Sequence, residues 1–422
     1  MSVALANSKR RKVKPIGSLS ITLTGLVYIA MLLFMGAAAM NTQTPLLFII
    51  FGLMIGVMLA GGVISQWVLR RIQIRRDVPD SATVGQPLRI EYEVDNRKSF
   101  WPALSLTLAE LDDAEAFERQ PHGYLLHAAG SQKALVHASA TPLRRGPVRL
   151  ERFQISTSFP FGFVKRAAFR RERDTVLVRP AQGTVDPVAM TRLLSAESSG
   201  LNQRPRPGGY DEFYGTRDYR PGDPIRMIHW RRSARTGGGA TPQRAGGSLV
   251  VKQMTRVAPP RLLLCVDTFA PSDADTPALI DIERNLATAA SILAAATRRG
   301  LAVGLIMAGE KRLTEILPDR TKRGRRDLMA VLAEAPRNTD VPAGNLVSRA
   351  ATVSPNDTTV MLITAGEGHP ADAPATRPSA GGRGTIRRGN VVTILTRPGQ
   401  VESWVRFDDE LDWEAMIARE DA

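Results

Sequence analysis

The sequence predicts a two-helix transmembrane hairpin, then an antiparallel β-sandwich-like module, and then an α/β domain with an open, mainly parallel sheet. Three observations carry this prediction. A long stretch near the start lacks charge, residues 78–180 alternate apolar and polar side chains, and continuous apolar strands alternate with helices from residue 261. The predicted segments are a basic N-terminus (1–20), two transmembrane helices (21–40 and 45–69), the β module (78–180), a connector (181–260) and the α/β domain (261–422).

The charge-free stretch runs from Pro15 to Leu69 and contains no Asp, Glu, Lys or Arg. A polar turn at 41–45 divides it. Residues 21–40 would form a helix about 30 Å long, which matches the hydrocarbon core of a bilayer. Residues 45–69 are long enough to span with some tilt. The stretch therefore predicts two membrane crossings joined by a short turn.

Basic residues flank the hairpin on both sides, whereas the turn between its helices has no charge. The flanking basic residues are Lys9, Arg10, Arg11, Lys12, Lys14, Arg70, Arg71, Arg75 and Arg76. The positive-inside rule then predicts a multi-pass protein of the cytoplasmic membrane with both termini cytoplasmic, so its first partner is the lipid bilayer. An alternative is a cleaved signal peptide at 9–39. We disfavour it because the basic residues at 70–76 would then anchor the wrong side.

The net charge of +15 is weaker evidence for nucleic-acid binding than its size suggests. The nine flanking residues stand without an acidic residue before Asp77, so they supply nine of those fifteen charges. A nucleic-acid-binding protein should carry a strong excess over its whole soluble part, so this class is disfavoured. The single Cys265 excludes an intramolecular disulfide and a cysteine-based zinc site.

Residues 78–180 show the period of two that is typical of half-buried strands. In 88–95 the apolar residues alternate with charged ones, and 104–108, 148–150 and 176–178 repeat the pattern. Gly and Pro punctuate the strands, for example at Arg145-Gly146-Pro147. The region contains no catalytic grouping, so we expect a spacer or docking module.

From residue 261 the pattern changes to that of a buried parallel sheet. The apolar run 262–266 ends at Asp267, and 301–307, 360–363 and 391–395 read as further strands. Residues 278–299 place apolar side chains on one helical face. Strand and helix in alternation predict the open α/β domain.

The most distinctive motif lies at the end of the connector, where Leu201–Arg256 carries eleven basic and four acidic residues. Its candidate binding or structural residues are Glu212, Arg217, Tyr219, Gly222, Asp223, Arg226, Trp230, Ser233 and Arg235. Three interpretations stay open. The acidic residues pair with the arginines in a polar clasp between the two domains; or arginines receive an acidic protein or a phosphorylated ligand; or Glu212 and Asp223 serve an enzyme as acid/base or metal ligands.

This motif resembles the signature of the domain-of-unknown-function 58 family. The matching residues run from Glu212-Phe213 through Gly222-Asp223 and Trp230 to Arg235, followed by Leu249–Gln253. The resemblance covers most of the chain and implies two membrane helices, a strand-rich region and a von Willebrand A-like α/β domain. Departures are His229, where the family usually has an acid, Phe159 before Pro-Phe-Gly, and an insertion at 237–247.

A von Willebrand A-like domain implies a magnesium site that this chain matches poorly. The family loop reads Asp-x-Ser-x-Ser, and here it reads Asp267-Thr268-Phe269-Ala270-Pro271. The later threonine is Thr364, but the acid that should follow it is missing. We expect a degenerate site at Asp267 and Thr268, no tightly held metal and no cofactor. Asp273 and Asp275 are expected to cap the next helix.

The resemblance implies a non-enzymatic adaptor, because proteins of this family are commonly encoded beside MoxR-type AAA+ ATPases and transglutaminase-like membrane proteins. The residues themselves indicate an anchor, a binding-type fold and no catalytic set. The alternatives are a metal-dependent hydrolase or phosphotransfer enzyme using Glu212 and Asp223, and a phosphate- or nucleic-acid-binding module.

Overall fold

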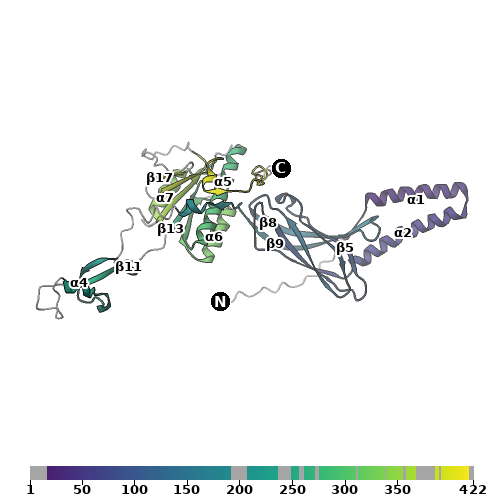
Figure 1. Cartoon of the computed structure of the whole chain (residues 1–422). Coiled ribbons are helices and arrows are strands. Elements are labelled where there is room, and N and C mark those ends of the chain that lie inside the picture. The colour runs from purple at the N-terminus through teal and green to yellow at the C-terminus, as the bar shows by residue number, and fades with distance from the viewer. Residues whose placement is uncertain are drawn as a thin grey trace.

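The fold is described from a computed structural model (Figure 1). The residues that it describes are 17–191, 207–235, 249–255, 261–270, 275–309, 312–337, 339–354, 358–366, 385–388 and 391–417. Figure 1 shows helices α1 and α2 extending from one end of a strand-rich module and the α/β domain lying at its other end.

Helices α1 (Leu23–Thr42) and α2 (Pro45–Leu69) form the hairpin. Gln43 turns the chain with a φ of 52°, and Pro45 opens α2, where its missing N–H needs no partner. Both helices are long and apolar enough to cross a membrane, and few of their side chains are buried. A helix that is apolar all round and unburied by protein suits lipid. The first helix begins and ends two residues later than predicted.

The expected N-terminal segment 1–20 differs from the structure at its end. Residues Gly17–Ile21 form strand β1, which pairs antiparallel with the start of β9, from Gly17 opposite Ala168 to Ile21 opposite Val164. The rest of the basic segment lies outside the described residues. The hairpin is therefore tied into the module on both sides, because β2 follows α2 after two residues.

The β module is one nine-stranded sheet that folds over on itself. Its strand order is β1-β9-β8-β5-β6-β7-β4-β2, with β3 parallel to β9 and the other neighbours antiparallel. After β1, its strands are β2 (Ile72–Asp77), β3 (Ser81–Thr83), β4 (Leu88–Asn96), β5 (Ala103–Glu110), β6 (His122–Ala128), β7 (Lys133–Ala140), β8 (Gly146–Thr157) and β9 (Val164–Arg179). Apart from β1, the strands of the module therefore begin at residue 72, ahead of the predicted boundary at 78.

The predicted alternation and the sandwich-like packing are both visible in this sheet. Every second residue of β4 from Leu88 to Asn96 is buried, which confirms the period of two. Strands β6 and β7 are joined at one described pair, His122 opposite Ser139, so the sheet divides there into two halves. Buried side chains from both halves, among them Tyr92 and Phe153, fill one core.

The α/β domain is a six-stranded mixed sheet in the order β15-β14-β13-β16-β18-β17. The four inner strands are parallel, and β15 and β17 are antiparallel edges. Its elements are β13 (Arg261–Val266), α5 (Thr276–Arg298), β14 (Ala302–Ala308), β15 (Leu313–Asp319), α6 (Lys322–Ala333), α7 (Ala343–Val353), β16 (Thr358–Thr364), β17 (Thr385–Arg388) and β18 (Val391–Leu395). The open, mainly parallel sheet agrees with the sequence; α7 and the two edge strands were not predicted.

Helix α5 lies between the two domains. Asp275 caps it by accepting a hydrogen bond from the Ala278 N–H at 3.1 Å, as expected. Its apolar face packs on the sheet, while Ala287 enters the core of the β module. The C-terminal segment adds to this junction, because Met416 is buried in the same core. Strand β10 (Thr184–Val185) pairs with β19 (Val405–Arg406) beside it.

Candidate functional site

The signature residues form a small unit built on a two-stranded ribbon. Strand β11 (Pro207–Asp218) pairs antiparallel with β12 (Val250–Thr255), so that Arg217 lies opposite Val251 and Glu212 opposite Thr255. Between the strands come a short 3₁₀ turn, η2 (Ile225–Met227), and helix α4 (Trp230–Arg235). The side chain of Glu212 lies outside the described part of the chain.

An ion pair closes the turn that follows β11. The Arg217 guanidinium donates to both oxygens of Asp223, at 2.6 and 2.7 Å, and the Arg220 N–H donates to the same carboxylate at 2.9 Å. These hydrogen bonds, the one from Arg217 first, hold the pKa of Asp223 below its usual value. Gly222 has a φ of 104°, a conformation that favours glycine. The turn thus explains why three signature positions, Arg217, Gly222 and Asp223, occur together.

Ser233 fastens helix α4 to the ribbon. Its side chain is 1% exposed, and its hydroxyl accepts a hydrogen bond from the Val250 N–H at 2.9 Å. The His229 N–H donates to the Val250 carbonyl at 2.7 Å, and the Tyr219 N–H donates to the Leu249 carbonyl at the same distance. Backbone groups make the last two bonds, so these bonds do not depend on which side chain stands at position 229.

The unit exposes apolar and basic side chains on η2 and α4. Ile225 is 71% exposed and Trp230 is 60% exposed. Arg226, Arg231 and Arg235 are exposed beside them. We call these five residues the Arg–Trp face. The sequence identified three of them; Ile225 and Arg231 were not singled out, although both stand within the motif.

The signature unit does not lie between the two domains, which is where the clasp interpretation would place it. Figure 1 shows the unit with β11 and α4 set apart from both sheets, so the Arg217–Asp223 pair stabilises the unit itself. Arg145 at the distal end of the β module makes the connection instead. Its side chain is 3% exposed and pairs with Glu283 of α5 at 3.0 Å, and Glu283 also pairs with Arg337 at 3.1 Å.

Carbonyl groups complete the Arg145 site. Its Nη1 donates to the carbonyls of Ala333 and Ala335, at 3.0 and 2.6 Å, at the carboxyl end of helix α6. Arg337 donates in addition to the carbonyl of Met416 in the C-terminal segment at 3.0 Å. The sequence marked Arg145 only as part of a turn, since its acidic partner stands 138 residues away.

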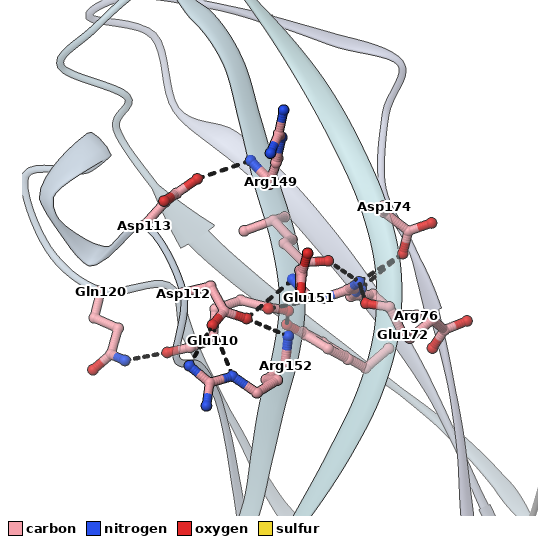
Figure 2. Close-up of polar contacts among 12 residues, drawn as sticks. Arg76, Glu110, Asp112, Asp113, Gln120, Arg149, Glu151, Arg152, Glu172 and Asp174 are labelled. Atoms are coloured by element: carbon pink, nitrogen blue, oxygen red, sulfur yellow. Dashed lines mark hydrogen bonds and ion pairs between the residues drawn. The ribbon is translucent and has the colours of Figure 1, made fainter. Parts of the chain in front are cut away.

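A second cluster of charges lies inside the β module (Figure 2). Arg76 of β2 pairs with Glu110 of β5 at 2.8 Å and with Asp174 of β9 at 2.7 Å, and its side chain is fully buried. The Tyr92 hydroxyl donates to the other oxygen of Glu110. Burial raises the pKa of Glu110, against the opposing effect of Arg76, and raises that of Tyr92, so the tyrosine stays a donor.

The buried cluster corrects one expectation about the membrane flank. Arg76 was grouped with the basic residues that follow α2, yet it faces the protein core rather than lipid headgroups. The sequence contained the signal, because Ile72, Ile74 and Arg76 stand at alternate positions and therefore share one face of β2. The cluster spans strands of both sheet halves and has the properties of an internal fastening.

The degenerate metal position lies at the carboxyl end of β13. Asp267 is buried and accepts hydrogen bonds from the Thr364 hydroxyl at 2.6 Å and from the Phe269 N–H at 3.1 Å. The Thr268 hydroxyl lies 3.2 Å from that of Thr339. The structure thus brings Asp267, Thr268 and Thr364 together, with protein donors on both oxygens of the carboxylate. Among the described residues no group of three or more His, Cys, Asp or Glu is placed to hold a metal.

One family model matches part of the chain. The model of the family described as "Protein of unknown function DUF58" matches residues 215–359, which include most of the signature unit and much of the α/β domain. No curated protein matches the chain. A crystal structure of a GH20 exo-β-N-acetylglucosaminidase from Vibrio harveyi is similar at 8% identity and a TM-score of 0.14, which carries no argument. The match covers 69% of this chain, and the chain spans 57% of that structure's length.

Proposed function

We propose that the chain is a membrane-anchored, non-enzymatic adaptor that docks a protein partner on the cytoplasmic side through the signature unit and the α/β domain. The observation that carries this proposal is the Arg–Trp face. An exposed tryptophan and isoleucine among arginines have the composition of an interface hot spot, in which aromatic and arginine side chains dominate the binding energy.

The internal order of the unit supports a docking role. Ser233 and the Arg217–Asp223 pair fix the backbone, so the face is preorganised and loses little conformational entropy on binding. The arginines suit carboxylates, which they bind with two parallel hydrogen bonds. The expected partner surface is therefore acidic with an apolar pocket.

The proposal places the unit near a membrane. Helices α1 and α2 would cross the bilayer with both ends of the hairpin on the cytoplasmic side, and the β module would space the α/β domain from the surface. The length and hydropathy of the helices and the basic residues Arg70, Arg71 and Arg75 support this arrangement.

We also propose that the α/β domain is of the von Willebrand A type, in a form adapted to binding without a tightly held magnesium ion. The sheet order and the position of Asp267 at the end of β13 support the assignment. The hydrogen bonds that Asp267 accepts from Thr364 and Phe269 support a structural role for its carboxylate.

The partner that we propose is a MoxR-type AAA+ ATPase, with a transglutaminase-like membrane protein in the same assembly. The family resemblance is the support for this choice. The hydrolase and phosphotransfer alternative gains nothing from Asp223, since both of its oxygens accept hydrogen bonds from Arg217. Nucleic-acid binding would require the Arg–Trp face to bind with an affinity that falls steeply with salt.

Crosslinking in membranes tests the docking proposal. The full chain is compared with Trp230→Ala and with Arg235→Ala, and the captured ATPase is quantified. Because truncation of an aromatic hot spot costs about 2 kcal/mol, we expect Trp230→Ala to weaken capture roughly 30-fold. Arg89→Ala, an exposed arginine on β4, is the matched control and should capture as wild type does. Equal capture by all four proteins would make the face structural and end the proposal.

A further inference from the structure

The membrane-proximal end of the β module is built from two loops that lie against the hairpin. The first, 97–102, connects β4 to β5, and the second, 158–163, connects β8 to β9. Together they expose Phe100 at 90% and Phe161 at 47%, far more than is usual for phenylalanine in a water-facing loop. We call them the rim loops.

The first rim loop is held firmly beside the end of α2. Asn96 is fully buried and its amide donates to the carbonyls of Trp101, Ala128 and Ala129 at 3.0 to 3.1 Å. The Lys98 ammonium donates to the carbonyl of Val68 at 2.6 Å. It thereby satisfies one of the carbonyls that a helix end leaves unpaired.

An aromatic contact continues the same attachment. The rings of Trp101 and Trp67 meet edge to face, with centroids 5.8 Å apart, and Trp67 is the third residue from the end of α2. Tryptophan at such a position marks the level of the lipid headgroups. Phe100 is therefore presented at that level on an ordered loop rather than on a free chain end.

The second rim loop reaches further along the helices. A Cβ placed on Gly61 would lie 3.4 Å from the Phe161 ring, and Gly61 precedes the end of α2 by eight residues, or about 12 Å. The Phe163 ring stacks on Tyr28 of α1 with centroids 4.1 Å apart. A Cβ on Gly25 would come within 2.1 Å of the Phe163 carbonyl, so only glycine permits this approach.

Backbone groups of the second rim loop find partners in the protein. The Thr22 N–H donates to the Phe163 carbonyl at 3.1 Å, and the Thr22 hydroxyl donates to the carbonyls of Gly162 and Phe163. The Gly162 N–H donates to the Ser158 carbonyl at 2.8 Å. Irregular backbone is tolerated at membrane depth only where its polar groups are satisfied in this way.

We propose that the rim loops are immersed in the leaflet from which α2 emerges, with Phe100 and Phe161 in contact with lipid acyl chains. This inference rests on the proposed membrane anchoring and goes beyond it, because it makes the β module an interfacial element rather than a spacer held away from the surface. The carbonyl of the exposed Arg71 accepts a hydrogen bond from the Arg97 N–H of the first rim loop at 3.1 Å, and the exposed Lys165 follows the second rim loop in sequence. Both side chains then lie where anionic headgroups can bind them.

The occupant of this surface follows from its continuity with α1 and α2. The exposed rings extend the apolar surface of α1 and α2, which the protein leaves unburied. The same lipid that covers the two helices therefore covers the rings. Helix α2, at about 37 Å, exceeds a hydrocarbon core of roughly 30 Å by a few Å at each end. Gly61 and the Phe161 beside it thus fall below the headgroups.

Lipid-phase quenching tests the proposal on the full chain. Phe100→Cys and Phe161→Cys are labelled with a bimane fluorophore and reconstituted, one chain per disc, into nanodiscs of phosphatidylcholine and phosphatidylglycerol with doxyl spin labels on the acyl chains. Cys265 is fully buried and burial raises the pKa of its thiol to about 12, so it stays unlabelled. We expect both labels to lose fluorescence to the spin-labelled lipid.

Labels at two control positions distinguish a failure of the rim proposal from a failure of the proposed membrane anchor. Leu59→Cys lies in α2, and Gln86→Cys lies in an exposed turn before β4, about 30 Å from the rim along that strand. Quenching at 59 with none at 100, 161 or 86 overturns the rim proposal and leaves the anchor intact. Absence of quenching at 59 as well overturns the anchor and the rim proposal together.

Discussion

Arg145 joins the β module to the α/β domain through a single guanidinium. Its Nε donates to Glu283 and its Nη1 donates to the carbonyls of Ala333 and Ala335, while its Nη2 is buried with no hydrogen-bond partner among the described residues. A buried charge that loses its partner is costly, since the remaining ion cannot recover its hydration. Glu283 also pairs with Arg337, so the loss of Arg145 should cost less free energy than it would if Glu283 were left without a partner.

Arg145→Ala should therefore lower the free energy of unfolding by about 3 kcal/mol, measured by urea denaturation of the detergent-solubilised chain. The control Arg89→Ala removes an exposed arginine and should change it by no more than about 0.5 kcal/mol. Equal effects from both variants would mean that the junction does not depend on Arg145.

The burial of Lys98 predicts the direction in which stability changes with pH. Burial lowers the pKa of Lys98 to about 8, whereas the unfolded chain keeps its ordinary value of 10.5. Between these values the unfolded chain holds a proton that the folded chain has released, so folding becomes more favourable as the pH rises from 8 to 10.5. Below pH 8 the cost of the buried charge is present in full.

Thermal melting from pH 7 to 10.5 checks this sign. The melting temperature of wild type should rise relative to that of Lys98→Met across the window, because the variant lacks the titrating group. Lys133→Met, at an exposed lysine on β7, is the control for general effects of removing a positive charge. A wild-type curve parallel to that of Lys98→Met would contradict the assignment.

At the scale of elements, the sequence predicted those whose burial is set by local pattern. The charge-free stretch gave α1 and α2, alternation gave β4, and the apolar runs gave the inner parallel strands. Edge strand β15 was not predicted because its residues are mostly half-buried and show no continuous apolar run. The spacing of apolar residues therefore predicts helix or strand wherever one face of the element is clearly buried.

Long-range pairing could not be predicted in the same way. Strand β1 pairs with β9 more than 140 residues later, and no local signal in Gly17–Ile21 marks its partner. Helix α5 was expected to bury one face, but Ala287 enters the core of the β module, and the Ser291 hydroxyl accepts a hydrogen bond from the Gly183 N–H of the connector. The candidate site was predicted by motif; the exposure of Ile225 and the separation of the unit from both domains required the structure.

The signature unit should lose local stability when Ser233 is replaced by Ala. The change leaves the Val250 N–H without its hydroxyl partner, which costs about 1–2 kcal/mol. Hydrogen–deuterium exchange of β12 should then quicken by roughly tenfold, while the inner strands of the α/β sheet keep their protection. Ala234→Ser, at the exposed neighbouring position, is the control. Unchanged exchange in β12 would show that Ser233 does not fasten α4.

At the scale of the whole molecule, the proposed orientation is open to direct labelling in cells. Asn41→Cys, in the exposed last turn of α1 beside the connection to α2, should react with a membrane-impermeant maleimide added outside. Gln86→Cys should react only after lysis, and an external protease should leave a C-terminal tag intact. Digestion of the tag in intact cells would reverse the orientation and remove the cytoplasmic adaptor.

The pairing of β1 with β9 has a consequence for the order of biosynthesis. A ribosome adds about 5–20 residues per second, so the partner of β1 emerges on the order of ten seconds or more after β1 itself. During this interval Leu19 and Ile21, which stay more than half exposed even in the finished fold, sit on a strand with an open edge next to the nascent hairpin. Chains truncated before residue 164 would leave the edge of β1 permanently unpaired. Such fragments should aggregate rather than accumulate as folded intermediates.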